Sequence, residues 1–178
     1  MNRLFKQSLK VTALSISIFL ILMVTAYASG IRVNTTKSIP IGFYHITDDE
    51  IHKGAYVIFC PPQLTVFDVA KERDYIGAGF CPGGYGYMMK RILAAKNDMV
   101  SVTKNGVKVN NELLAFSIPI EKDKAGRLLP RYQTNHYTLG ESELLLMSDV
   151  SGTSFDGRYF GPINRTQIEA VIRPIIIW

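Results

Sequence analysis

The chain begins with a segment that is long and apolar enough to cross a membrane. Residues 11–30 (VTALSISIFLILMVTAYASG) contain no charged side chain, and the residues before them include Arg3, Lys6 and Lys10 but no acid. Twenty helical residues span roughly 30 Å, about the thickness of the hydrocarbon core of a bilayer. Because a basic flank stays in the cytoplasm, the sequence predicts a cytoplasmic flank and transmembrane signal-anchor over residues 1–30. It also predicts an exported domain over residues 31–178.

A cleaved signal peptide is the alternative interpretation of this segment. Ala26-Tyr27-Ala28 fits the small-x-small pattern that precedes a cleavage site. The apolar run is longer than the roughly 7–15 residues of a signal-peptide core, which favours a retained anchor. Both interpretations export the remainder of the chain.

The net charge of residues 31–178 indicates whether a nucleic-acid partner is expected. The whole chain has a net charge of +5, but residues 31–178 hold 17 basic and 15 acidic side chains, a net charge of +2. No dense Lys/Arg stripe with interleaved aromatic residues remains there, so we expect no nucleic-acid partner. The apolar content of 47% and the charged content of 20% are typical of a folded domain rather than a disordered chain.

Cys60 and Cys81 both lie in the exported part. In an oxidising compartment we expect them to form one disulfide, worth about 3 kcal/mol on the chain-entropy model. Two separate buried thiols are the alternative, since the spacing alone is not diagnostic. The three histidines show no H-E-x-x-H or comparable ligand spacing, so we expect neither a metal site nor another cofactor.

Most of the exported part has the pattern of short β-strands. An Asn105-Gly106 pair between alternating residues predicts a hairpin. One short helix is expected over residues 67–74, a glycine-rich loop over residues 77–86, and a buried strand for the final Ile-Ile-Ile-Trp. The predicted strands cover residues 42–46, 55–60, 85–93, 99–103, 107–109, 137–139, 144–147 and 168–178.

Two residues lie in surroundings that suit a catalytic role. Ser38 lies eight residues after the apolar run, in a turn-prone stretch stiffened by Pro40. Lys90 lies within an apolar strand. Burial lowers the pKa of a lysine, which suits a general base. Taken singly, a turn serine and a lysine with a buried stem and an exposed amine are the commoner outcomes.

Three boxes resemble those of type I signal peptidases, in the same order and behind an N-terminal anchor. Residues 147–161 (MSDVSGTSFDGRYFG) are similar to the M-G-D-N-x-x-x-S-x-D-S-R-x-[WF]-G box of that family. Lys90-Arg91-Ile92, followed by residues 97–100 (NDMV), resembles its K-R-[IV]…G-D-x-V box. Ser38 then falls at the serine nucleophile. The resemblance implies a mainly β fold: a signal-peptidase-like antiparallel β-barrel or coiled β-sheet domain behind one transmembrane helix.

The serine box points to one branch of the family. Residues 38–44 (SIPIGFY) have an S-x-P-x-G pattern, which, with the short chain and the cysteine pair, is similar to the TraF-type peptidases of plasmid conjugative transfer. Members of that branch mature a pilin precursor, and some join its ends into a ring. Val150 and Gly157 depart from the family pattern, so no role is carried over to them.

The resemblance also implies roles for the site residues. Ser38 is expected to attack the scissile carbonyl and Lys90 to act as general base. The backbone N–H of Ser38 and the hydroxyl of Thr36 are expected to hold the oxyanion. Ser154 is expected to orient the Lys90 amine, with support from an Asp156–Arg158 ion pair. A purely structural role for that ion pair is the alternative.

The predicted function is that of a membrane-anchored Ser-Lys endopeptidase of the bacterial inner membrane, single-pass, with its catalytic domain in the periplasm. Its expected partners are an exported, pilin-like precursor, the lipid bilayer and components of a conjugation or type IV secretion apparatus. Hydrolysis and cyclisation of the precursor both stay open. Two alternatives remain: a general signal peptidase of broad substrate range, and a non-catalytic periplasmic scaffold of such an apparatus.

Overall fold

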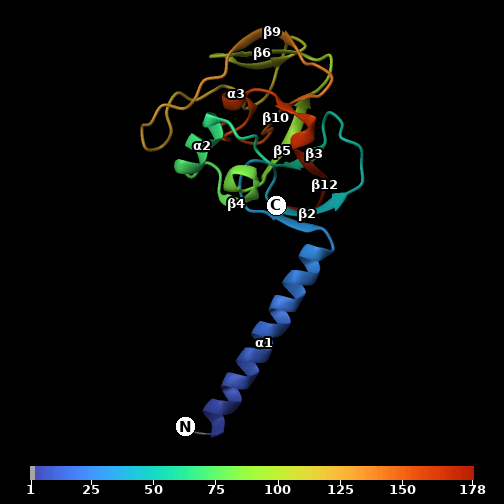
Figure 1. Ribbon diagram of the computed structural model, residues 1–178, viewed down its shortest axis with the longest axis vertical. Coiled ribbons are helices and arrows are strands. Elements are labelled where there is room, and N and C mark those ends of the chain that lie inside the picture. Colours follow the sequence, from blue (N-terminus) through green and yellow to red (C-terminus); the bar gives the residue numbers. More distant parts are fainter. Residues whose placement is uncertain (1–2) are drawn as a thin grey trace. The chain divides into compact units, whose positions relative to one another are not determined.

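The computed structural model describes residues 3–178 and divides the chain into two compact units, Met1–Arg32 and Val33–Trp178. The first unit consists mainly of one helix, α1 (Arg3–Ala28), shown in blue in Figure 1. Its segment Gln7–Ala28 has a mean hydropathy of 2.2 and is long and apolar enough to cross a membrane. The helix ends where Gly30 adopts a positive φ of 89°, a conformation that glycine tolerates without steric cost.

The second unit is built from two β-sheets. A seven-stranded sheet has the order β1-β2-β12-β3-β5-β10-β11, and a four-stranded sheet has the order β8-β7-β6-β9. Every strand pair whose register is known is antiparallel. The strands of the larger sheet are β1 (Ile31–Asn34), β2 (Gly42–Thr47), β3 (Tyr56–Phe59), β5 (Met88–Ala94), β10 (Glu143–Met147), β11 (Ile163–Asn164) and β12 (Ile168–Ile177).

The smaller sheet lies at the opposite end of this unit from the C-terminus (Figure 1). Its strands are β6 (Met99–Thr103), β7 (Gly106–Val109), β8 (Glu112–Leu113) and β9 (Thr134–Thr138). Asn105-Gly106 stands at the predicted hairpin between β6 and β7. Beyond the sheets lie the short helices α2 (Thr65–Glu72) and α3 (Gly157–Phe160), the strand β4 (Ala78–Cys81) and two 3₁₀ turns, η1 (Pro82–Gly84) and η2 (Arg165–Gln167).

The main core packs α2 and α3 against the larger sheet. Phe67 of α2 contacts the rings of Tyr85, Phe155 and Phe160, and its side chain is fully buried. A separate cluster, centred on Val100 and Val107, fills the space beneath the smaller sheet. Strand β5 contributes to both clusters and to a third that includes Met89, so it is buried along most of its length. This central strand carries Lys90.

The mainly β, antiparallel fold predicted from the sequence is confirmed, and each predicted strand overlaps an observed one. The prediction of a loop over residues 77–86 is wrong in part, because the segment contains β4 and η1. The prediction of a buried C-terminal strand is also wrong in part. The strand forms and Ile176 and Ile177 pair with Phe43 and Gly42 of β2, but residues 175–178 are 51–69% exposed.

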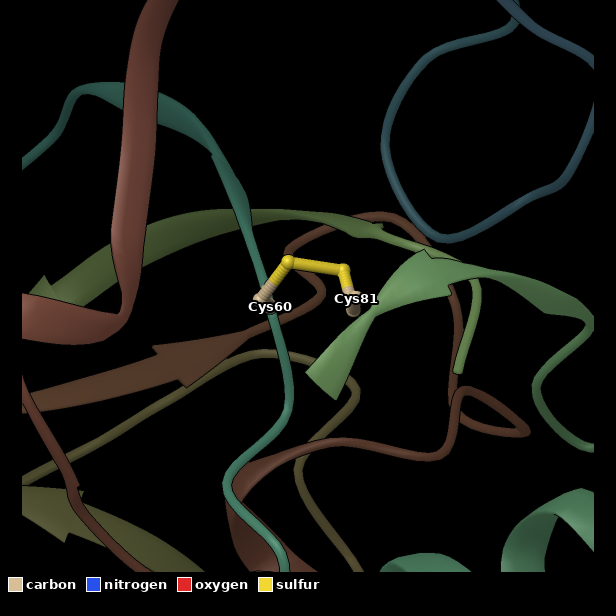
Figure 2. The surroundings of a disulfide bond; sticks show 2 residues. All are labelled: Cys60 and Cys81. Atoms are coloured by element: carbon tan, nitrogen blue, oxygen red, sulfur yellow. A yellow bond between two sulfur atoms is a disulfide. The ribbon is translucent and has the colours of Figure 1, made fainter. Parts of the chain in front are cut away.

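The predicted disulfide is present. Cys60, which follows β3, is bonded to Cys81 at the end of β4, with 5.4 Å between the two Cα atoms (Figure 2). The bond closes a loop that contains α2 and the residues Tyr75, Ile76 and Gly77. It therefore ties that loop to the edge of the main core.

Candidate active site

Ser38 lies in the connection between β1 and β2, and the side chain of Asn34 organises this connection. Asn34 is 4% exposed. Its Nδ2 donates hydrogen bonds to the carbonyl oxygens of Thr36, Ile39 and Pro40 over 2.7–3.0 Å. Its Oδ1 accepts hydrogen bonds from the backbone N–H and the hydroxyl of Thr36, at 3.2 and 3.0 Å. One buried amide thus holds the backbone on both sides of Ser38.

A second anchor fixes the end of this connection. The hydroxyl of Tyr44, a fully buried residue of β2, donates to the carbonyl of Pro40 over 2.6 Å. Burial raises the pKa of Tyr44 to about 12, so the hydroxyl keeps its proton and remains a donor. Sequence reasoning missed both Asn34 and Tyr44 as residues of the site. A single asparagine at a strand end and a tyrosine in a strand carry no motif, and only the folded connection shows what they bind.

Lys90 lies on β5 opposite Val57 of β3 and is 2% exposed. Burial lowers its pKa from the ordinary 10.5 to about 8. The nearby carboxylate of Asp156 acts in the opposite direction, and the guanidinium of Arg158 lowers the pKa further. A substantial fraction of Lys90 is therefore neutral near pH 8, as a proton acceptor must be.

Ser38 and Lys90 line the same cavity, of about 210 Å³. Thr36 lines it as well, and Asn34 and Met89 contribute to its wall. The structure therefore brings together three of the residues that the sequence predicts for the reaction. The hydroxyl of Thr36 is engaged with Asn34 Oδ1, so it has to exchange that partner in order to donate to an oxyanion.

Ser154 lines a neighbouring cavity that Ser38 and Thr36 also line. Its Oγ is buried and has no hydrogen-bond partner among residues 3–178. A buried hydroxyl without a hydrogen-bond partner destabilises the fold. A polar group that forms a hydrogen bond with Ser154 Oγ is therefore stabilised there. The predicted contact between Ser154 and the Lys90 amine is not among the hydrogen bonds of the structure, and this role stays a prediction.

Asp156 and Arg158 form a fully buried ion pair, with 2.7 Å between Arg158 Nε and Asp156 Oδ1 and 2.9 Å between Nη2 and Oδ2. Asp156 Oδ2 also accepts from the backbone N–H of Ser148. Arg158 Nη1 donates to the carbonyls of Phe116 and Gly152. The pair thereby holds the turn between Ser148 and Asp156, which carries Ser154.

A second ion pair lies beside the lysine strand. Arg91 Nη1 contacts Asp149 Oδ2 at 2.5 Å, and the guanidinium carbon of Arg91 lies 5.3 Å from the ring centre of Tyr56. This contact joins β5 to the segment after β10. Among residues 3–178, no three His, Cys, Asp or Glu side chains gather into a possible metal site.

Comparison with known proteins identifies the family. The family model described as signal peptidase, peptidase S26, matches residues 5–178. A plasmid transfer protein TraF from Escherichia coli is 70% identical over 159 residues, covering 89% of each chain. Another from the same species is 59% identical over 174 residues, covering 98% of each chain.

A more distant relative and a solved structure show how far the similarity extends. A probable conjugal transfer protein TraF from Sinorhizobium fredii (strain NBRC 101917 / NGR234) is 30% identical, covering 86% of this chain and 80% of its own. A signal peptidase I of Enterococcus faecalis V583 aligns with a TM-score of 0.42 and 14% identity, covering 71% of this chain and 100% of its own. From the match over residues 5–178 and the identities to its relatives, the chain belongs to the signal peptidase family, peptidase S26, and within it to the TraF-type branch.

Proposed function

We propose that the chain is a membrane-anchored serine endopeptidase in which Ser38 is the nucleophile and Lys90 the general base. One observation carries the proposal: a lysine that is 2% exposed, with its pKa lowered to about 8, lines the same cavity as a serine held by a buried amide. A lysine paired with a serine is a known variant of the serine-protease mechanism. Membership of the signal peptidase family supports the same reaction.

The reaction begins with proton transfer from Ser38 to Lys90. As the Oγ–H bond of Ser38 breaks, Oγ forms a bond to the scissile carbonyl carbon and the proton moves to Lys90 Nζ. The resulting oxyanion is held by the backbone N–H of Ser38 and the hydroxyl of Thr36. When the carbon–nitrogen bond of the substrate breaks, Lys90 returns the proton to the leaving amine, and the acyl group stays on Ser38 as an ester.

The ester is resolved by one of two nucleophiles. Attack by water releases a linear product and regenerates the Ser38 hydroxyl. Attack by an α-amine of the same precursor joins its ends, and that amine outcompetes water when it is held in place, because effective molarities of positioned groups reach about 10⁵ M or more. Both outcomes use the same residues of this chain.

The substrate that we propose is an exported, pilin-like precursor of a conjugation apparatus. The support is that the relatives are named plasmid or conjugal transfer proteins. Residues 1–30 then act as a cytoplasmic flank and a single-pass anchor in the bacterial inner membrane. The basic residues ahead of the apolar run favour a periplasmic location for residues 31–178.

The test is processing of a co-expressed pilin precursor from the same transfer system. We expect Ser38→Ala and Lys90→Ala each to abolish processing while the full-length protein stays folded and membrane-bound. Lys108→Ala, which changes an exposed lysine of β7, serves as the control and should process normally. Normal processing by either dyad variant would overturn the assignment.

Two further measurements complete the test. Mass spectrometry of the product separates hydrolysis from cyclisation, because a ring is one water lighter than the linear peptide. Protease treatment of spheroplasts reports topology: residues 31–178 should be degraded from the periplasmic side. Cleavage of many unrelated preproteins at similar rates would instead favour a general signal peptidase.

A further inference from the structure

A second cavity lies beside the nucleophile, and no step of the proposed reaction uses it. Its volume is about 450 Å³, against about 210 Å³ for the cavity that contains Lys90. Ser38, Thr36, Tyr75 and Phe155 line both cavities, so Ser38 lies where the two meet. A peptide whose scissile bond reaches Ser38 extends in both directions from it, and the second cavity is available to the residues on one side.

One wall of this cavity comes from a long segment, residues 114–133, which we call the strap. The strap connects β8 to β9. Side chains outside the strap hold it at several points. Besides the bond from Arg158 to the Phe116 carbonyl, Arg73 Nη1 donates to the Leu128 carbonyl over 2.6 Å. Tyr75 Oη donates to Asp123 Oδ2 over 2.6 Å, and Tyr159 Oη accepts from the Ile120 N–H over 3.1 Å. These bonds fix the strap as one wall of a preformed site.

The charges around the cavity are unbalanced. Asp123 is engaged by its surroundings, because it accepts from Tyr75, from two backbone N–H groups of the strap and from Arg127 Nε. These hydrogen bonds hold the pKa of its carboxyl well below the usual range. Arg127 is therefore neutralised by Asp123. Lys37 and Lys124 also line the cavity, and neither forms an ion pair within residues 3–178.

The rest of the lining combines an apolar and aromatic wall with hydroxyl side chains. The wall includes Ile120, Leu129, Phe155 and Tyr159, and the hydroxyls include those of Ser151, Thr153 and Ser154. An apolar wall with two unpaired cations suits a peptide segment that carries both an apolar side chain and a negative charge. We propose that this strap pocket binds a carboxylate-bearing segment of the precursor on one side of the scissile bond. The carboxylate is supplied by an acidic side chain or by the end of the chain. The proposal rests on Ser38 being the nucleophile, because that role is what brings a peptide to the junction of the cavities.

The test measures binding rather than turnover, so that it does not depend on the chemistry. The full-length Ser38→Ala protein in detergent micelles is titrated into four dansyl-labelled peptides, and fluorescence anisotropy gives each Kd. The peptides are dansyl-Ala-Leu-Glu-Ala and dansyl-Ala-Leu-Gln-Ala, each with a free or an amidated C-terminus. Comparison of Glu with Gln isolates the side-chain carboxylate, and comparison of acid with amide isolates the terminal one.

We expect the doubly acidic peptide to bind most tightly and the neutral peptide least tightly. Each useful carboxylate should contribute about a two- to fivefold gain at low salt, the range for exposed ion pairs, and the gain should shrink as salt is added. Lys37→Met and Lys124→Met should each reduce the preference for acidic peptides. Lys122→Met, a change on the same strap but outside the cavity lining, is the matched control and should retain the preference.

Equal binding of the acidic and neutral peptides would overturn the proposal, as would an unchanged preference in both the Lys37→Met and Lys124→Met proteins. Failure of the pocket is distinguishable from failure of the proposed function. If the wild-type protein processes the pilin precursor while the Ser38→Ala protein shows no preference among the peptides, only the pocket is overturned. A protein that prefers acidic peptides but processes no precursor overturns the proposed function.

Discussion

Replacing Lys90 with methionine is expected to stabilise the folded protein at neutral pH. The side chain of Lys90 is 2% exposed, and burial lowers its pKa from 10.5 to about 8. That difference corresponds to about 3 kcal/mol by which the buried ammonium of Lys90 destabilises the folded state. Methionine has a similar length and no charge, so the substitution removes this cost.

The gain should depend on pH in a defined way. Below pH 8 Lys90 is protonated in both the folded and the unfolded chain, and the full cost is present. Between pH 8 and 10.5 the unfolded chain binds more protons than the folded one, so the stability of the wild type rises with pH. The advantage of Lys90→Met should therefore be largest below pH 8, shrink across that window and vanish above it. Packing differences between lysine and methionine add a constant to the difference in unfolding free energy and leave its dependence on pH unchanged.

Urea unfolding of the full-length proteins in detergent micelles, followed by circular dichroism between pH 7 and 10.5, measures the difference. Lys108→Met is the control, because Lys108 is exposed and its substitution should show no such pH dependence. If the difference between Lys90→Met and the wild type is the same at pH 7 as at pH 10.5, the lysine is not desolvated and the argument for a neutral base fails.

Three other predictions concern the pH profile, the serine connection and the disulfide. With the pKa of Lys90 at about 8, the neutral fraction rises about tenfold between pH 7 and pH 9. The kcat/KM for precursor cleavage should therefore rise about tenfold, and a flat profile would argue against Lys90 as the base. Asn34→Ala leaves the buried Ile39 carbonyl without its partner, which should cost about 1–3 kcal/mol in urea unfolding and lower kcat. An unchanged kcat would mean that Asn34 does not position the nucleophile. Loss of the disulfide in the Cys60→Ser, Cys81→Ser double variant should cost about 3 kcal/mol, and reduced wild type should melt at the same temperature as that variant.

The strands were predictable because their pattern is set by burial. Strand β10 is buried at four of its five positions, and residues 144–147 form a continuous apolar run. Strand β5 is buried at five of its seven positions although Lys90 and Arg91 interrupt its apolar residues. Short runs rich in apolar residues between turn residues therefore reveal both strands in the sequence. The shortest strands, β8 and β11, have two residues each, too few for any period to show. Strand β4 forms within a glycine-rich segment whose end is fixed by the bond from Cys81 to Cys60, a constraint that local propensity does not contain.

The candidate site was predictable only in part. Ser38 and Lys90 are found from their boxes, and the structure places both in one cavity. Asn34 escapes prediction because its importance lies in three carbonyls that converge on it only when the connection folds. The strap pocket escapes for a related reason, since Lys37 and Lys124 are far apart in the sequence and their common cavity exists only in the folded chain.

Arg158 has a second consequence for the lysine beyond its hydrogen bonds to backbone carbonyls. A lone carboxylate beside a buried lysine raises the lysine pKa, and the charge of Asp156 acts on Lys90 in that direction. The guanidinium of Arg158, bonded to both oxygens of Asp156, acts on Lys90 in the opposite direction. Burial is the largest single influence on the Lys90 pKa, and the two charges act in opposite directions on it. The pair can therefore hold the Ser154 turn in place without forcing the proposed base into its protonated form.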